Sequence, residues 1–147
     1  MEIPLLKIGH DYPDFLGWVG RWRSFISFEN ARLGVPGVLL RHDVDISLVL
    51  AHQMALVENS LGVRSTYFVM VNSDFYNPAE ASQMRLLREL VELGHEIGLH
   101  FDQSAYGFSN DLDLDRAIGA EAKWLEHLVG CEVTAVSFHN PSLIGSA

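Results

Sequence analysis

A run of branched apolar residues that ends in two carboxylates constrains the fold of this chain more than any other feature. Residues 38–42 begin with Val, Leu and Leu, and Asp43 and Asp45 follow with one valine between them. Such a run is typical of a strand buried on both faces in a parallel sheet. Two acids are costly to bury without partners, and α/β folds gather ligands at the carboxyl ends of their strands. The feature therefore predicts half of a metal-dependent hydrolytic site.

The rest of the sequence alternates between helix-like and strand-like segments. Apolar spacing predicts helices over residues 12–25, 48–61, 80–93 and 112–129. Branched and aromatic runs predict strands over residues 38–42, 65–71, 96–100 and 133–139, with a short strand near 25–28. This alternation favours parallel strands in an α/β fold. The 147 residues suit a single domain, 1–147, in which residues 1–37 form an N-terminal helical cover.

Composition and charge narrow the range of partners. The formal net charge of −9 opposes binding to nucleic acid or to an anionic membrane surface. No apolar run reaches the roughly 18 residues of a membrane span, and the first residues lack the apolar core of a signal peptide. The single cysteine, Cys131, allows no disulfide within the chain and suits a reducing compartment. We therefore expect a cytoplasmic protein.

Three predicted strands end in side chains that bind metals or move protons. Asp43 and Asp45 end the first, His100 ends the third and His139 ends the fourth. These ends share one edge of a parallel sheet. Hydrolytic zinc sites use three His, Asp or Glu ligands and keep a position for water. Asp43 and Asp45 point the same way along a strand, so that one can bind the metal while the other accepts the proton of the water.

Other assignments stay open at this point. Asp102 and His42 are alternative ligands, although His42 should point to the face opposite Asp43. Asp45 or Ser47 could instead cap the helix over residues 48–61. The histidines could be hydrogen-bonded strand-end residues, and Tyr67 could belong to the core or to a pocket wall.

Four segments together resemble the polysaccharide deacetylases of the NodB type, carbohydrate esterase family 4. They are Arg-His-Asp-Val-Asp at 41–45, Ser-Thr-Tyr-Phe at 65–68, Gly-His-Glu-Ile-Gly-Leu-His at 94–100 and Ser-Phe-His-Asn-Pro at 137–141. The third segment is the most specific. The resemblance implies a distorted (β/α) barrel that removes N- or O-acetyl groups from sugars with Zn²⁺ or another divalent metal. The His-Asp-Val-Asp variant resembles a subgroup associated with cell-surface polysaccharide biosynthesis, which implies an acetylated sugar or polysaccharide precursor as substrate.

Carried onto this chain, the resemblance makes Asp43 the general base and makes Asp45 and His100 metal ligands. The family has a second metal histidine four residues after the first, where this chain has Ser104. His139 is therefore expected to complete the metal set, with Asp102 as the next choice.

The resemblance also implies residues that orient the base or bind substrate. An arginine before a proline orients the base in the family, and Asn140 occupies its place here. Asn140, His42, Asp102 and Tyr67 are the expected members of this group.

The family's general-acid histidine lies on a late strand, beyond the strands expected in this chain. The resemblance therefore predicts an incomplete barrel, and with it a homo-oligomer or a missing C-terminal part. Two other functions stay open. One is a truncated or degenerate deacetylase-fold protein that binds metal or sugar without catalysis, and the other is a metal-dependent hydrolase of small cyclic amides.

Overall fold

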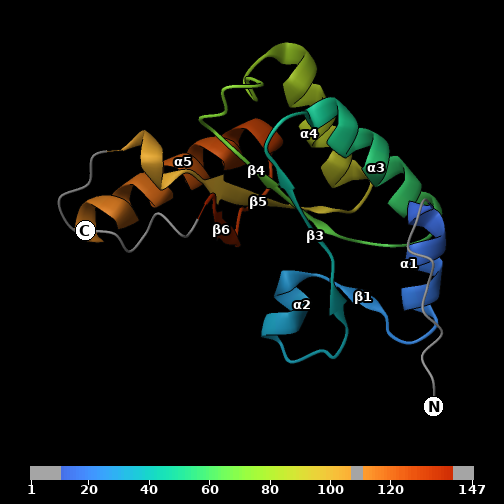
Figure 1. The fold of residues 1–147 in the computed structure, drawn as a ribbon. Coiled ribbons are helices and arrows are strands. Elements are labelled where there is room, and N and C mark those ends of the chain that lie inside the picture. The colour runs from blue at the N-terminus through green and yellow to red at the C-terminus, as the bar shows by residue number, and fades with distance from the viewer. Residues whose placement is uncertain (1–10, 107–110, 141–147) are drawn as a thin grey trace.

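The fold is built on a curled parallel sheet with helices on one face (Figure 1). The computed structural model describes residues 11–106 and 111–140. The strands are neighbours in chain order: β3 (Arg41–Val44), β4 (Thr66–Val69), β5 (Glu96–Phe101) and β6 (Val136–Phe138). The helices between them are α3 (Leu48–Ser60), α4 (Ala81–Glu92) and α5 (Asp111–Val129). The sheet curls like half a barrel, with a helix-covered face and a concave face, and the expected α/β fold with parallel strands is confirmed.

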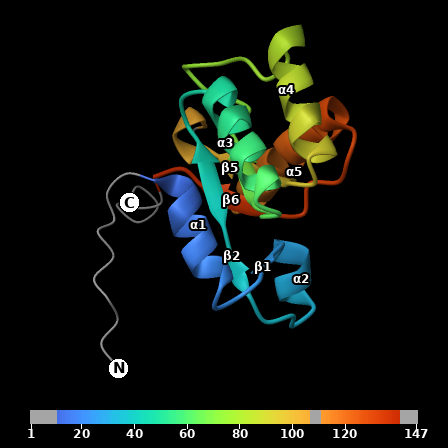
Figure 2. The ribbon, with the colours of Figure 1, turned by 90° about the vertical axis from the view of Figure 1, so that its right-hand side faces the viewer.

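The N-terminal part adds a separate pair of short strands. Its elements are α1 (Tyr12–Gly20), β1 (Phe25–Ile26), α2 (Phe28–Arg32) and β2 (Val38–Leu39), and β1 pairs with β2 in parallel. Helix α1 packs against α3, whereas α2 lies away from α3, α4 and α5 (Figure 2). The Phe28 amide donates to Glu96 of β5 at 3.0 Å, and its ring meets Phe68 edge-on at 5.6 Å between centroids. Helix α2 is thereby fixed to the concave face.

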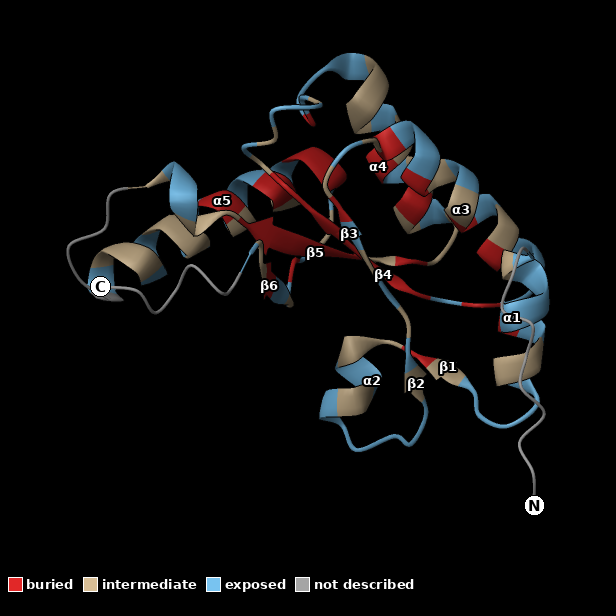
Figure 3. Ribbon diagram, in the orientation of Figure 1, coloured by how far each residue is buried: buried red, intermediate tan, exposed pale blue. Residues whose placement is uncertain are grey.

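The core lies between the sheet and its helices. Figure 3 shows buried residues along β4 and β5 and on the sheet-facing sides of the helices. Ala51 and Ala55 of α3 are buried beside Tyr67, and the small side chains allow α3 to approach the sheet closely. Among the described residues, no helix is long and apolar enough to cross a membrane.

The strand expected over residues 38–42 differs from the prediction in two ways. It breaks at Leu40 into β2 and β3, and it is not buried on both faces, because Arg41 and Asp43 are exposed while Val44 is buried. The reason is its place at the edge of the sheet. Within the described chain, β4 is the strand paired with β3, so one flank of β3 is left open.

In the N-terminal part, one expectation was wrong and one helix was missed. The helix predicted over residues 12–25 ends at Gly20, and its buried residue is Leu16, while Trp22 of the expected apolar face is 62% exposed. Helix α2 was not expected, since five residues are too few to show a helical period. It begins at Ser27, whose hydroxyl accepts a hydrogen bond from the Asn30 amide at 3.0 Å.

A buried carboxylate ties the helices to the helix-covered face of the sheet. Glu58 of α3 is fully buried. Its Oε1 contacts the Tyr12 hydroxyl of α1 and lies 2.6 Å from His42 Nε2 of β3. Its Oε2 accepts from Ser65 Oγ at 2.5 Å and from the Tyr67 hydroxyl of β4 at 2.8 Å. One side chain thus joins two helices and two strands.

These hydrogen bonds decide the charge of Glu58. Burial by itself raises the pKa of a carboxyl group, but the hydrogen bonds from His42, Ser65 and Tyr12 outweigh it and lower the pKa of Glu58 to about 2. Burial and the nearby Glu58 charge raise the pKa of the Tyr12 and Tyr67 hydroxyls, so both stay protonated donors. The network therefore consists of a carboxylate surrounded by donors.

A glycine at the centre of the sheet makes room for an aromatic ring on the concave face. Gly98 of β5 lies opposite Phe68 of β4 in the strand register. A Cβ atom at Gly98 would lie 2.6 Å from two carbons of the Phe68 ring and 3.2 Å from the Ala135 carbonyl oxygen. The absence of a side chain at Gly98 leaves room for the Phe68 ring on the concave face.

We predict that Glu58→Ala lowers the free energy of unfolding by about 3–5 kcal/mol, because it leaves several buried donors without their acceptor. Glu58→Gln should make stability less dependent on pH. The folded-state pKa lies below the ordinary value of 4.5, so the carboxylate contributes stability above about pH 4.5 and loses it as the pH falls toward about 2. Urea unfolding across this range measures both effects. Glu92→Ala, at an exposed position of α4, is the control, and an equal loss there would contradict the prediction.

We predict that Gly98→Ala destabilises the fold by about 1–3 kcal/mol, because the added methyl group overpacks the Phe68 ring. The matched control is Gly119→Ala in the middle of α5, where an added Cβ meets nothing within 4 Å. That change should stabilise the protein by up to about 1 kcal/mol through helix propensity. Thermal unfolding of both variants compares them, and a neutral Gly98→Ala would contradict the packing argument.

Candidate metal site

The curl of the sheet brings together three side chains from the carboxyl ends of three strands. Asp45 follows β3, His100 belongs to β5 and His139 follows β6. Asp45 Oδ1 lies 3.1 Å from His100 Nε2 and 3.6 Å from His139 Nδ1, and the two nitrogens are 3.2 Å apart. Among the residues that the structure describes, these three form the group able to hold a metal ion. They are the three ligands that the sequence predicts.

The spacing of the three atoms matches the requirements of a metal ion. Ligand atoms about 2.0–2.2 Å from a tetrahedral zinc ion lie about 3.3–3.6 Å from one another. The observed separations of 3.1, 3.2 and 3.6 Å are close to these values. Two imidazole nitrogens and one carboxylate oxygen are also a common donor set of catalytic zinc. The residues present therefore fit a divalent ion in both geometry and chemistry.

Burial gives a second reason to expect an ion. His100 is 3% exposed, and Asp45 Oδ1 is itself buried. Within the described residues, neither Asp45 Oδ1 nor His100 Nδ1 has a hydrogen-bond partner. Burying a carboxylate oxygen that accepts no hydrogen bond is costly, and a cation bound between Asp45 Oδ1 and the two nearby imidazole nitrogens would compensate it.

His139 is held by the residue that follows it. The Asn140 side-chain amide lies 2.9 Å from His139 Nε2, which leaves Nδ1 facing Asp45 and His100. Asn140 has a φ of 47°, the left-handed conformation that asparagine tolerates better than most residues. Asn140 thus contacts a metal-site histidine, while its expected role is to orient Asp43. Pro141, the next residue of that motif, lies outside the described residues.

Asp43 has a different partner, which the sequence reasoning missed. Arg41 Nη2 donates to both carboxylate oxygens of Asp43, at 2.6 Å to Oδ2, and to Ser137 Oγ of β6 at 2.5 Å. The guanidinium also lies over the Phe68 ring, 4.7 Å from its centroid. Arg41 stands two residues before Asp43, so the period of the strand already places both on one face. The contact with Ser137 depends on the curl and has no signal in the sequence.

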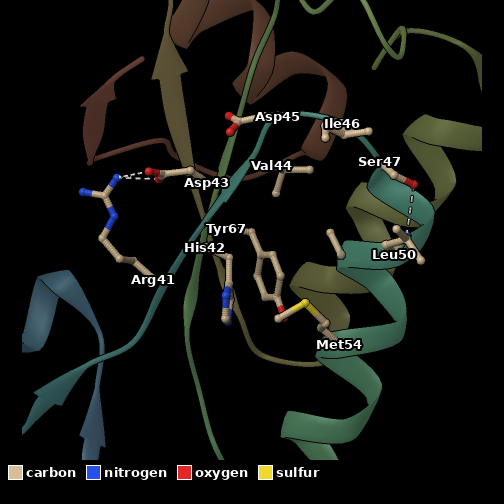
Figure 4. A pocket seen from close by; sticks show the side chains of 11 residues that line it. Arg41, His42, Asp43, Val44, Asp45, Ile46, Ser47, Leu50, Met54 and Tyr67 are labelled. Atoms are coloured by element: carbon tan, nitrogen blue, oxygen red, sulfur yellow. Dashed lines mark hydrogen bonds and ion pairs between the residues drawn. The ribbon is translucent and has the colours of Figure 1, made fainter. Parts of the chain in front are cut away.

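The remaining predicted site residues lie outside the metal-binding group, although His42 and Tyr67 line the pocket that also includes Asp43 and Asp45. His42 and Tyr67 point to the helix-covered face, where both contact Glu58. Figure 4 shows that their side chains point away from that of Asp43. Asp102 begins the short 3₁₀ turn η1 (Gln103–Ala105), where its Oδ1 accepts from the Ser104 amide at 2.9 Å and from its hydroxyl at 2.7 Å. The structure does not bring any of these residues into the metal-binding group.

A pocket of about 440 Å³ lies beside the two carboxylates. It follows β3, and its lining includes Asp43 and Asp45 together with Leu50 and Met54 of α3 (Figure 4). The pocket combines an apolar wall with the acidic strand end. A small molecule could therefore reach the carboxylates from the open flank of β3.

Comparisons with known proteins add no family to this geometry. Neither the protein-family models nor the curated protein sequences contain a match to this chain. The arguments for the site are therefore the distances, the burial and the donor chemistry described above.

Proposed function

We propose that this chain is a metal-dependent hydrolase that removes acetyl groups from an amino sugar or a polysaccharide precursor. In this proposal the curled sheet is part of a (β/α) barrel of the NodB type. The observation that carries the proposal is the triangle of Asp45, His100 and His139, with donor atoms 3.1–3.6 Å apart at the carboxyl ends of parallel strands. The motif resemblance supplies the substrate class.

Asp45, His100 and His139 would hold Zn²⁺ or another divalent metal. When bound, such an ion supplies Lewis acidity, which lowers the pKa of a bound water and polarises an acyl carbonyl group. The donor set also suits other first-row metals, so the metal that the protein retains is part of the test. Asp45 Oδ1, which is buried and accepts no hydrogen bond, supports a cation at this position.

Asp43 is the proposed general base. Asp43 belongs to β3 and Asp45 follows that strand, and their spacing of two residues puts both carboxylates on the concave face. In the reaction a water oxygen attacks the acetyl carbonyl carbon, and Asp43 accepts a proton from that water. The bond between the carbonyl carbon and the sugar nitrogen then breaks, and Asp43 can return the proton to the leaving amine. The products are acetate and a free amino sugar.

A second candidate function is metal or sugar binding on the same fold without hydrolysis. It is favoured by one observation: both carboxylate oxygens of Asp43 already accept hydrogen bonds from Arg41. This leaves fewer lone pairs on Asp43 to bind a water. The two functions differ in whether acetate is released.

We predict stoichiometric Zn²⁺ binding in calorimetric titrations. Replacing Asp45, His100 or His139 by alanine should weaken it by at least about 100-fold, since each supplies one of three ligands. The Co²⁺-loaded protein should show the intense visible absorption of a four-coordinate site. His127→Ala, an exposed histidine of α5, is the matched control and should bind as wild type does. Equal affinity in His100→Ala and wild type would contradict the metal site.

We predict acetate release from N-acetylglucosamine oligomers or a nucleotide-linked N-acetyl sugar. Asp43→Asn should lower this release by about 10²–10⁴-fold, the usual contribution of a general base, while Zn²⁺ affinity changes little. Asp45→Asn should lose both Zn²⁺ binding and acetate release. If Asp43→Asn releases acetate at the wild-type rate, Asp43 is not the base. If Zn²⁺ binds but none of these sugars yields acetate, the non-catalytic candidate is favoured.

A further inference from the structure

We propose that Arg41 is the positioning residue for Asp43, and that it fixes the carboxylate beside the metal-binding triangle. The inference rests on the proposed function and assigns a role that neither the motif resemblance nor the strand pattern gives to Arg41. Its basis is a set of contacts made by one guanidinium group on the concave face.

The contacts of Arg41 differ from those of an ordinary surface ion pair. A single nitrogen, Nη2, contacts both oxygens of Asp43 and Ser137 Oγ, the last at 2.5 Å, so that its two N–H groups are shared among three acceptors. The Phe68 ring supports the guanidinium plane from below, at 4.7 Å from its centroid. The Arg85–Glu89 pair on α4, by contrast, has one contact at 3.8 Å, and its arginine is 72% exposed against 43% for Arg41. Arg41 is therefore held from three directions.

The same contacts tie Asp43 to the metal-binding strands. Arg41 belongs to the first strand of the sheet and Ser137 to the last, and Ser137 pairs in register with the metal ligand His100. Three strand spacings of a flat sheet would separate β3 from β6 by about 14 Å, which exceeds the reach of an arginine side chain. The contact exists because the sheet curls. The curl that forms the metal triangle also brings Arg41 to Ser137.

Orientation is what a general base needs from such a partner. An aspartate side chain at the end of an edge strand can rotate, and Asp43 is partly exposed with a side-chain accessibility of 37%. Two hydrogen bonds from Arg41 limit that rotation and leave a defined direction for the remaining lone pairs. A base held in one direction reacts with a water at a fixed place, and small misplacements of reacting groups cost about 10²-fold in rate.

The test is the kinetics of acetate release by Arg41→Ala. We expect kcat to fall by about 10²-fold with KM little changed, because Arg41 acts on the base and not on the sugar. The kcat of Arg41→Lys should fall less than that of Arg41→Ala.

Millimolar guanidinium ion should restore part of the activity of Arg41→Ala and none of that of Asp43→Asn. The double variant Arg41→Ala/Asp43→Asn should be no slower than Asp43→Asn alone. Arg85→Ala is the matched control and should behave as wild type.

Zinc titration supplies a readout that does not depend on turnover. Arg41→Ala should bind Zn²⁺ within about threefold of wild type, whereas Asp45→Ala should not. If Arg41→Ala weakens zinc binding as much as Asp45→Ala does, Arg41 acts on the metal ligands and the inference is wrong. If Arg41→Ala fails to fold, Arg41→Lys is judged by the same kinetic and zinc criteria.

The outcomes separate this inference from the proposed function. If the wild type releases acetate and Arg41→Ala has the same kcat as the wild type, the role of Arg41 is overturned and the proposed function is left intact. An additive loss in the double variant, or no rescue by guanidinium ion, also overturns that role. Absence of acetate release from the zinc-loaded wild type overturns both.

Discussion

The packing of the Phe68 ring against Gly98 is a constraint on which the concave face of the sheet depends. A side chain there would meet the Phe68 ring and prevent the tight packing of the concave face. The four strands also curl far enough for side chains from the first and the last strand to share contacts. The metal triangle and the Arg41–Ser137 contact both span that distance. Neither would exist on a flat sheet with the same residues.

Strand β3 divides two kinds of chemistry between its faces. His42 points toward α3 and joins the buried Glu58 network, where every neighbouring donor stabilises one carboxylate. Arg41 and Asp43 point to the concave face, where they remain partly accessible. The alternation of the strand thus directs His42 toward the buried Glu58 and directs Asp43 toward the opposite face, where its partner is Arg41. Stability and the proposed reaction depend on separate groups.

Local patterns predict much of this fold, and tertiary effects explain the differences. The α3 helix could be predicted because Ser47 caps it, whereas its buried face could not, since apolar residues lie all round the helix and Leu50 is exposed. The metal residues could be grouped because parallel strands end at one edge, a rule that needs no coordinates. The burial of β3 could not be predicted, since an edge strand and a central strand have similar local sequences. Arg41 and Ser137 were missed because their contact comes from the curl, which no single segment encodes.

The order of the three metal-site residues along the chain has a thermodynamic meaning. Asp45 lies near the start of the main sheet and His139 just after its last strand, so an ion shared by them closes a loop that contains nearly the whole sheet. Closing a long loop removes conformational entropy from the unfolded ensemble, much as a covalent cross-link does. An ion that binds the folded chain alone also shifts the folding equilibrium by mass action. The concentration of free metal would then set how much of this protein is folded, independently of any reaction at the site.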